Sequence, residues 1–206
     1  PRWLDPHRDM IEACAEYGVR GVFCEKPLAP TLADCDAIVA AWRRGATIGG
    51  TSAGTACMSP VMLTGEGDLK VLRAGNVELS PGLGLFPGAV LDQHFVARLR
   101  QNRLMSVVLE HPQLLGIGID EGTAVWLRPD GTFQVLGEGS VVVYDAAGAT
   151  ATRARGEGPV LLGVRNLRTH VLIPGDAFDL AVRSVVPARY PAAPPMAAPL
   201  AAPAAA

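Results

Sequence analysis

Apolar and polar positions divide the chain into a helical front and a strand-rich rear. Residues 5–17 are predicted to form a helix that begins at Asp5-Pro6, and an apolar strand is predicted over residues 19–24. A capping pattern of Thr31 and Asp34 begins a second helix, which continues to about residue 44. This order of helix, strand, loop and helix is typical of an α/β unit.

After residue 45 the apolar runs become short and are separated by turns, which is typical of strands. A buried strand is predicted over residues 46–48, followed by a glycine-bounded turn and a helix that continues to about residue 63, disturbed by Pro60. A later helix is predicted to end near Glu110. Further strands are predicted at 89–91, 115–119, 123–127, 132–136, 140–144, 160–164 and 169–172. Residues 190–206 are almost wholly proline and alanine, and we interpret them as a disordered or extended tail.

The composition is that of a globular protein with a sizeable core. Of the 206 residues, 49% are hydrophobic and 18% are charged, and the net charge is −2. This balance gives no electrostatic reason to expect nucleic acid or an anionic membrane as a partner. No apolar run approaches the roughly 20 residues of a membrane span. The chain begins at Pro1, which hints at a fragment.

The four cysteines, Cys14, Cys24, Cys35 and Cys57, show no C-x-x-C spacing. Neither a zinc site nor a redox pair is therefore indicated. We expect reduced, mostly buried thiols in a cytoplasmic protein that needs neither a metal nor a cofactor.

Residues 50–54, Gly-Thr-Ser-Ala-Gly, fit the G-x-S-x-G pattern of a nucleophile elbow. The turn is sharp, so glycine is expected on both sides of Ser52, where a Cβ would collide with the strand or the helix. Ser52 is then expected at a helix N-terminus, where backbone N–H groups favour a developing negative charge. The pattern is short and common, so an ordinary strand-to-helix turn stays open as an alternative.

Two residues at predicted strand ends form a candidate catalytic set with Ser52. His94 follows the strand at 89–91, and Glu121 follows the strand at 115–119. A neutral histidine can take the proton of a serine, and a carboxylate on its other ring nitrogen fixes the tautomer. Strand ends converge at the carboxyl edge of an α/β sheet. A capping role for His94 and a turn role for Glu121 stay open.

A second candidate set, for substrate binding, surrounds the histidine: Asp92, Gln93, Arg98, Arg100 and Arg103. Guanidinium groups recognise carboxylates through planar forks. A pocket with both signs of charge suits a zwitterionic or doubly charged substrate. On an ideal helix Arg98 and Arg100 lie about 200° apart, so a solvated helix face is the alternative.

His7, residues 12–24 and Glu25-Lys26-Pro27-Leu28-Ala29 with Thr31 form a pattern of their own. Residues 1–43 resemble a fragment of the glucose-fructose oxidoreductase/inositol dehydrogenase family. In that family the Glu-Lys-Pro segment lies near the nicotinamide and its lysine is an active-site residue. The glycine-rich dinucleotide fingerprint is absent, so we favour a surface loop lysine at Lys26 and expect no NAD.

Three separated motifs carry another resemblance, over about residues 45–189. They are Gly49-Gly50-Thr51-Ser52-Ala53-Gly54, Asp92-Gln93-His94-Phe95 with the three arginines and Leu104, and residues 116–121 with Thr123-Ala124. They resemble the cyanophycinase family of serine-type exopeptidases, which is related to dipeptidase E. That family has a class I glutamine amidotransferase-like α/β fold and releases β-aspartyl-arginine dipeptides from cyanophycin, multi-L-arginyl-poly-L-aspartate.

The resemblance implies a role for each matching residue. Ser52 would be the nucleophile, His94 the base and Glu121 the residue that orients the base. The substrate-binding positions would be Asp92, Gln93, Arg98, Arg100 and Arg103. The Ala53 N–H is a reasonable oxyanion donor, and relatives suggest a homodimer.

The front portion of that family, which supplies early strands and a glycine-rich loop with a glutamine, has no counterpart in this sequence. We expect an oxidoreductase-like fragment at 1–43, an N-terminally truncated peptidase domain with additional C-terminal strands at 44–189, and the tail at 190–206. One lost oxyanion donor costs about 10²–10³ in kcat. A catalytically inactive chimeric or truncated remnant therefore stays open, as does a related aspartyl or isoaspartyl dipeptidase.

Overall fold

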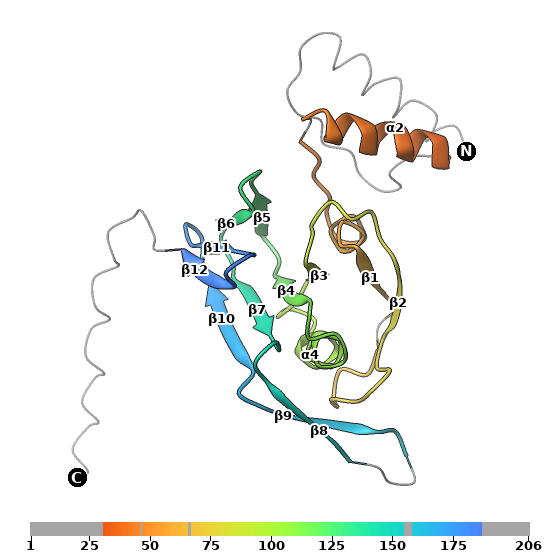
Figure 1. Ribbon diagram of the computed structural model, residues 1–206, viewed down its shortest axis with the longest axis vertical. Coiled ribbons are helices and arrows are strands. Elements are labelled where there is room, and N and C mark those ends of the chain that lie inside the picture. The colour runs from red at the N-terminus through yellow and green to blue at the C-terminus, as the bar shows by residue number, and fades with distance from the viewer. Residues whose placement is uncertain (1–30, 46, 66, 155–157, 187–206) are drawn as a thin grey trace, which may run out of the picture.

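The computed structural model describes residues 31–45, 47–65, 67–154 and 158–186. Within these ranges the chain is a mixed α/β protein with mostly strands and few helices (Figure 1). The predicted second helix is confirmed as α2 (Leu32–Arg43). The helix predicted at 5–17, the strand predicted at 19–24 and the tail lie outside the described residues.

A four-stranded sheet forms the centre of the described structure. Its strands lie in the order β10 (Arg168–Leu172), β7 (Val141–Asp145), β4 (Leu115–Ile119) and β3 (Ala89–Gln93), which confirms four predicted strands. β3 and β4 are parallel, whereas β7 is antiparallel to both β4 and β10. Gln93 pairs with Ile119 at the ends of the parallel strands. The residues that follow these two strands therefore begin at the same edge of the sheet.

β3, β4 and β7 are buried on both faces, whereas the edge strand β10 is mostly exposed, which explains why the first three are richer in apolar residues. On one face, Val90 packs with Leu104 of α4 (Gln101–Glu110). On the other face, Leu91 packs in a cluster with Phe133 of the second sheet. Burying a side chain of this size contributes about 1.5–3 kcal/mol. The sheet is thus a rigid support for the loops at its edge.

Gly118 of β4 makes room for a large aromatic ring beside that edge. A Cβ built on Gly118 would lie 2.3 Å from the ring of Phe95. Phe95 is fully buried and meets the Tyr144 ring edge-on at 6.1 Å between centroids. The residue after His94 is therefore anchored in the core.

The second sheet contains β12 (Ser184–Val186), β11 (Ala177–Asp179), β6 (Thr132–Gly137) and β5 (Thr123–Leu127), all antiparallel in that order. The predicted hairpin of β5 and β6 is confirmed. β11 and β12 were missed because three residues are too few to show an alternating pattern.

The segment after the G-x-S-x-G turn differs from its prediction. The helix α3 (Ala53–Ala56) is one turn long, and the helix predicted to continue to residue 63 is wrong. The chain instead forms β1 (Val61–Thr64), which pairs antiparallel with β2 (Glu78–Pro81). Pro60 cannot donate an N–H to a helix, and the apolar residues after it gain a strand partner that no local pattern announces.

The buried strand predicted at 46–48 is also not formed at its described positions. Thr47 makes only an isolated bridge and Ile48 is half-buried outside any strand. The outward N–H of Leu91 in β3 is already satisfied, because it donates to Ser59 Oγ at 2.9 Å. The Ser59 hydroxyl therefore accepts a hydrogen bond that a backbone carbonyl of an adjacent strand would otherwise accept.

A two-stranded arm, β8 (Thr150–Ala154) and β9 (Leu161–Arg165), extends away from the central sheet (Figure 1). β9 confirms the prediction at 160–164, whereas β8 was missed because its residues are exposed and carry no apolar alternation. The Leu162 N–H donates to Leu72 O at 2.9 Å, which ties the arm to the body.

Asp145, at the end of β7, connects the two sheets. It accepts hydrogen bonds from Arg183 at 2.7 Å and Arg168 at 3.3 Å, and from the Ala147 N–H at 3.0 Å. Burial by itself would raise the pKa of Asp145, but these donors outweigh it and lower the pKa. The carboxylate therefore holds the turn before β12 against the central sheet.

Candidate active site

Ser52 lies in a tight turn that leads into α3. The Gly54 N–H donates to Thr51 O at 2.8 Å, and Thr55 Oγ1 donates to Gly50 O at 2.6 Å. A Cβ on Gly50 would lie 2.5 Å from Gly54 O, so glycine is required there. A Cβ on Gly54 would meet no atom within 4 Å. The prediction of a steric need for glycine on both sides is confirmed at Gly50 and wrong at Gly54.

The backbone of Ser52 is strained, with φ 52° and ψ −121°. A residue other than glycine pays of order 1–3 kcal/mol for such a conformation. The helix that follows is only four residues long, so individual N–H groups matter here more than a macrodipole. The Ala53 N–H has no acceptor among the described residues and is free to donate.

His94 directly follows β3 and faces the serine. Its Nε2 lies 3.2 Å from Ser52 Oγ. Its backbone is also in the left-handed region, with φ 49°, and this turn directs the ring toward α3. The Phe95 N–H donates to Ile119 O at 3.2 Å, which fixes the turn from the far side. The histidine is therefore held by the sheet and the core together.

Glu121 lies in the turn between β4 and β5, beyond the histidine. Its Oε1 is 2.9 Å from His94 Nδ1, and its side chain is 59% exposed. The neighbouring Asp120 takes a different partner, because its Oδ1 accepts the Ala97 N–H at 3.1 Å. The two adjacent acids therefore have different partners: Glu121 contacts the histidine ring, and Asp120 contacts the backbone that follows the histidine.

The structure therefore brings Ser52, His94 and Glu121 into one line of hydrogen bonds. With Nδ1 protonated toward Glu121, the Nε2 lone pair can accept the serine proton. A carboxylate beside the ring stabilises the imidazolium that this transfer creates. Such an arrangement is chemically able to produce a nucleophilic serine; the catalytic roles of the three residues stay a prediction.

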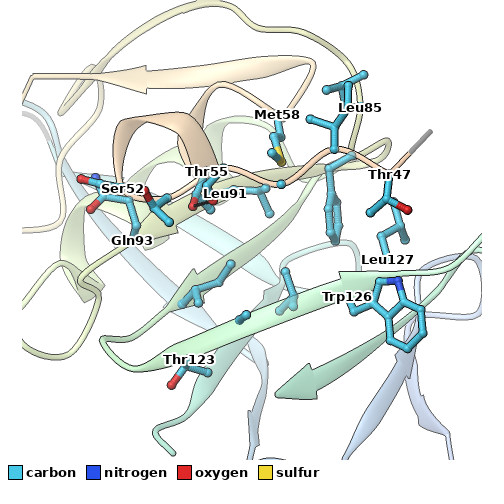
Figure 2. Close-up of a pocket in the computed structure, with 18 of the residues that line it drawn as sticks. Thr47, Ser52, Thr55, Met58, Leu85, Leu91, Gln93, Thr123, Trp126 and Leu127 are labelled. Carbon is cyan, nitrogen blue, oxygen red and sulfur yellow. Dashed lines mark hydrogen bonds between the residues drawn. The ribbon is translucent and has the colours of Figure 1, made fainter. Parts of the chain in front are cut away.

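A cavity of about 1090 Å³ opens beside these residues (Figure 2). Ser52, Gln93, His94 and Glu121 all line it. Gln93 Oε1 is buried and has no hydrogen-bond partner among the described residues. An unpartnered buried amide oxygen costs free energy, and this oxygen has almost no surface open to solvent.

Asp92 points to the opposite side of β3, because successive strand residues face opposite ways. It is 0% exposed. Its Oδ2 accepts Arg103 Nε at 2.7 Å, Arg103 Nη2 also reaches its Oδ1, and Arg100 Nη1 lies 3.7 Å from the same oxygen. Arg100 Nη1 further donates to Gln93 O at 2.8 Å. These buried charges hold the end of β3 from behind.

Most of the predicted substrate-binding residues lie outside the cavity lining. Gln93 lines it, whereas Asp92, Arg100 and Arg103 are buried beneath it and Arg98 is exposed. α4 begins only at Gln101, so Arg98 and Arg100 precede the helix instead of sharing it. The solvated helix face considered for the arginines is therefore wrong for the buried pair. Direct substrate contact by the five residues stays a prediction.

Sequence reasoning missed the far wall of the cavity. Trp126 and Arg128, near the end of β5, line it together with Arg43 at the end of α2. Nothing in their local sequence indicates a site, because they look like outward residues of a hairpin and a helix end. Only the packing of the hairpin against the central sheet brings them to the cavity.

Neither a metal centre nor a membrane span is found in the part of the chain that the structure describes. Among these residues no group of three or more His, Cys, Asp or Glu side chains is found that could hold a metal ion. None of its helices has the length and apolar character needed to cross a membrane.

Comparison with known protein families gives two matches along the chain. The family described as Peptidase family S51 matches residues 31–135, about half of the chain. The oxidoreductase family with an NAD-binding Rossmann fold matches residues 2–48. Both resemblances seen in the sequence are thereby confirmed, and the S51 match contains the whole set of candidate catalytic residues.

Similar curated proteins are named cyanophycinase. One from Trichormus variabilis is 46% identical over 143 residues, which are 69% of this chain and 48% of that protein. One from Synechococcus elongatus is 39% identical over 145 residues, which are 70% of this chain and 45% of that protein. The alignments span about half the length of the curated relatives that the chain matches.

Proposed function

Because the chain belongs to peptidase family S51, we propose that it carries the hydrolytic site of a cyanophycinase-like serine exopeptidase. The observation that carries this proposal is the line from Ser52 Oγ to His94 Nε2 at 3.2 Å and from His94 Nδ1 to Glu121 Oε1 at 2.9 Å. The strained backbone of Ser52 supports it, since strain is kept where the surrounding structure requires a special position.

In the proposed reaction, Ser52 Oγ attacks the scissile carbonyl while His94 Nε2 takes its proton. The Ala53 N–H donates to the oxyanion of the tetrahedral intermediate. His94 then gives the proton to the leaving amine, and an acyl-enzyme ester remains. Water, deprotonated by His94, hydrolyses the ester and restores the serine. Glu121 holds the imidazole tautomer and stabilises its charged form throughout.

The proposed substrate is cyanophycin, and the proposed product is the β-aspartyl-arginine dipeptide. The names of the relatives support this choice. The repeat of cyanophycin carries a guanidinium and a carboxylate, and residues with both signs of charge line the cavity: Asp120 and Glu121 are acidic, and Arg43 and Arg128 are basic.

The proposal includes an architecture. Residues 44–189 would be a peptidase domain of the class I glutamine amidotransferase-like type, incomplete at its N-terminal side. The parallel β3 and β4, with candidate catalytic residues at their ends, support this assignment. Residues 1–43 would be a separate oxidoreductase-like fragment and residues 190–206 a tail. A homodimer and a cytoplasmic setting complete the proposal; light scattering would test the dimer.

The test is hydrolysis of purified cyanophycin by the chain, with identification of the product. We expect β-aspartyl-arginine, and we expect Ser52→Ala to reduce turnover by about 10⁴-fold or more. Ser184→Ala serves as the matched control, because Ser184 is an exposed serine on β12.

Two results would contradict the proposal. A folded chain without turnover would identify an inactive remnant. Cleavage of isoaspartyl dipeptides but not of cyanophycin would identify the related dipeptidase activity instead.

A further inference from the structure

Glu121 is the least enclosed member of the candidate catalytic line. Its side chain is 59% exposed, and the contact of Oε1 with His94 Nδ1 at 2.9 Å is the only hydrogen bond of its carboxylate among the described residues. Holding a long, exposed side chain in one conformation costs conformational entropy. The position of this carboxylate therefore depends on how firmly the backbone of its turn is held.

The backbone of this turn is held by the connection between β6 and β7. The Glu138 N–H donates to Gly122 O at 3.0 Å, and the Asp120 N–H donates to Ser140 O at 3.2 Å. These two hydrogen bonds lie on either side of Glu121 and fix its neighbours. Neither of them reaches the peptide carbonyl of Glu121 itself.

Thr123, which begins β5 and lines the cavity (Figure 2), supplies the link to that carbonyl. Its hydroxyl donates to Glu121 O at 3.1 Å and accepts the Gly139 N–H at 3.0 Å. A threonine hydroxyl has a single proton to donate, and here the carbonyl of Glu121 takes it. One half-buried side chain thus connects the backbone of Glu121 to the connection between β6 and β7.

The two segments approach so closely that the facing positions have no room for a side chain. A Cβ on Gly139 would lie 2.5 Å from Thr123 Oγ1 and 2.9 Å from Glu121 O. A Cβ on Gly137 would lie 2.1 Å from Gly122 O. Glycine at both positions therefore keeps the hydroxyl of Thr123 within hydrogen-bond distance of its two partners.

We propose that Thr123 is a positioning residue of the hydrolytic reaction, which acts through Glu121 and does not touch the reacting atoms. Its hydroxyl holds the Glu121 backbone where the carboxylate can meet His94 Nδ1. A shift of this backbone would weaken that hydrogen bond, which keeps the imidazole proton on Nδ1 and leaves Nε2 free to accept the serine proton. This inference rests on the proposed function, because it assigns a further residue to the same reaction.

The first test compares Thr123→Val with Thr123→Ser in cyanophycin turnover. Valine keeps the branched shape that suits a strand but has no hydroxyl, whereas serine keeps the hydroxyl. We expect Thr123→Val to lower kcat about tenfold, the loss that corresponds to one hydrogen bond. KM should stay unchanged, because the proposed role involves no contact with substrate. Thr123→Ser should restore most of the turnover.

Thr132→Val is the matched control. Thr132 is also half-buried, and its hydroxyl also donates to a residue two positions earlier, to Asp130 Oδ1 at 2.7 Å. It lies at the other end of the same hairpin and does not line the cavity, so turnover should not change. Gly139→Ala approaches the proposed contact from the other side. Its methyl group would displace the Thr123 hydroxyl, and kcat should fall at least as far.

A double-mutant cycle with Glu121→Ala separates positioning from a general loss of stability. With no carboxylate left to position, Thr123→Val should cause no further loss of kcat. Equal losses in both backgrounds, or an unchanged kcat in Thr123→Val alone, overturn the proposal. So does an equally large loss in Thr132→Val. Circular dichroism checks that each variant is folded, and Gly139→Ala replaces Thr123→Val in the cycle if the valine variant does not fold.

A second readout needs no turnover. Proton NMR of the chain with isotope-labelled histidine follows the proton on His94 Nδ1, and His94→Asn identifies its signal. We expect the signal in the unaltered chain and in Thr123→Ser, and its loss by exchange with water in Thr123→Val. If the chain does not hydrolyse cyanophycin but shows this dependence, the proposed function fails and the positioning role stands. A signal that Thr123→Val leaves unchanged overturns the positioning role.

Discussion

At the end of β3, the polar side chains on the two sides of the strand lie in opposite environments. On one side, Gln93 and His94 face the cavity, and the histidine is partly exposed with a strained backbone. On the other side, Asp92 is fully buried and paired with Arg103. Adjacent residues of one motif therefore line the cavity on one side and form an internal support on the other.

The difference teaches that charge in a motif does not by itself indicate contact with substrate. A buried ion pair is weak evidence for stability as such, because desolvation offsets the attraction. Here the pair has a positional effect, since Arg100 donates to Gln93 O and Arg103 Nη1 donates to Gly65 O at 2.9 Å. The cluster joins β3, α4 and the loop after β1 directly behind the candidate base.

The substitution His94→Asn is the most direct test of the cavity side of β3. We expect cyanophycin turnover to fall by about 10⁴-fold, because the serine loses its proton acceptor. Stability should change little, since asparagine tolerates the positive φ of this position better than most residues. Turnover and thermal unfolding measured on the same preparation check both parts. Retained turnover would remove His94 from the mechanism.

The substitution Asp92→Asn tests the buried side of β3. Loss of the carboxylate leaves Arg103 buried without its charge partner, and we expect the free energy of unfolding to fall by about 3–5 kcal/mol. Urea unfolding measures the change. Glu138→Gln, an exposed acid on the hairpin side, is the control and should have almost no effect. If Asp92→Asn instead weakened substrate binding and left stability unchanged, Asp92 would be a substrate-binding residue.

The junction between the two sides is tested by Gly118→Ala. The added methyl group would collide with the Phe95 ring, so we expect a loss of about 1–3 kcal/mol in unfolding free energy. Because Phe95 follows His94, turnover should fall as well. Gly54→Ala places a methyl group in open space beside the serine and should be nearly neutral in stability. Equal effects of the two substitutions would contradict the steric argument.

Several elements of the fold could be predicted because their cause is local. The runs at β4, β7 and the β5–β6 hairpin are apolar or alternating over about five residues, β3 begins with three apolar residues, and each of them is a strand. β11 and β12 have three residues each, and β8 is wholly exposed. Such segments become strands through their partners, so their own sequence carries little information.

For the candidate site, the sequence by itself determined that His94 and Glu121 follow strands and that Ser52 lies in a sharp turn before a helix. Ser52, His94 and Glu121 were identified from a turn motif and from their positions after buried runs, and the parallel pairing of β3 with β4 brings the last two to one edge. The need for Gly50 was equally local, because a sharp turn leaves no room for a Cβ.

Only the tertiary structure decided which way the other charges face. The late start of α4 turns Arg103 inward to Asp92 and leaves Arg98 exposed, and the packing of the hairpin brings Arg128 to the cavity. The physical reason is that the strand period fixes only the alternation of side chains. Which face is core and which is cavity depends on elements packed from elsewhere in the chain.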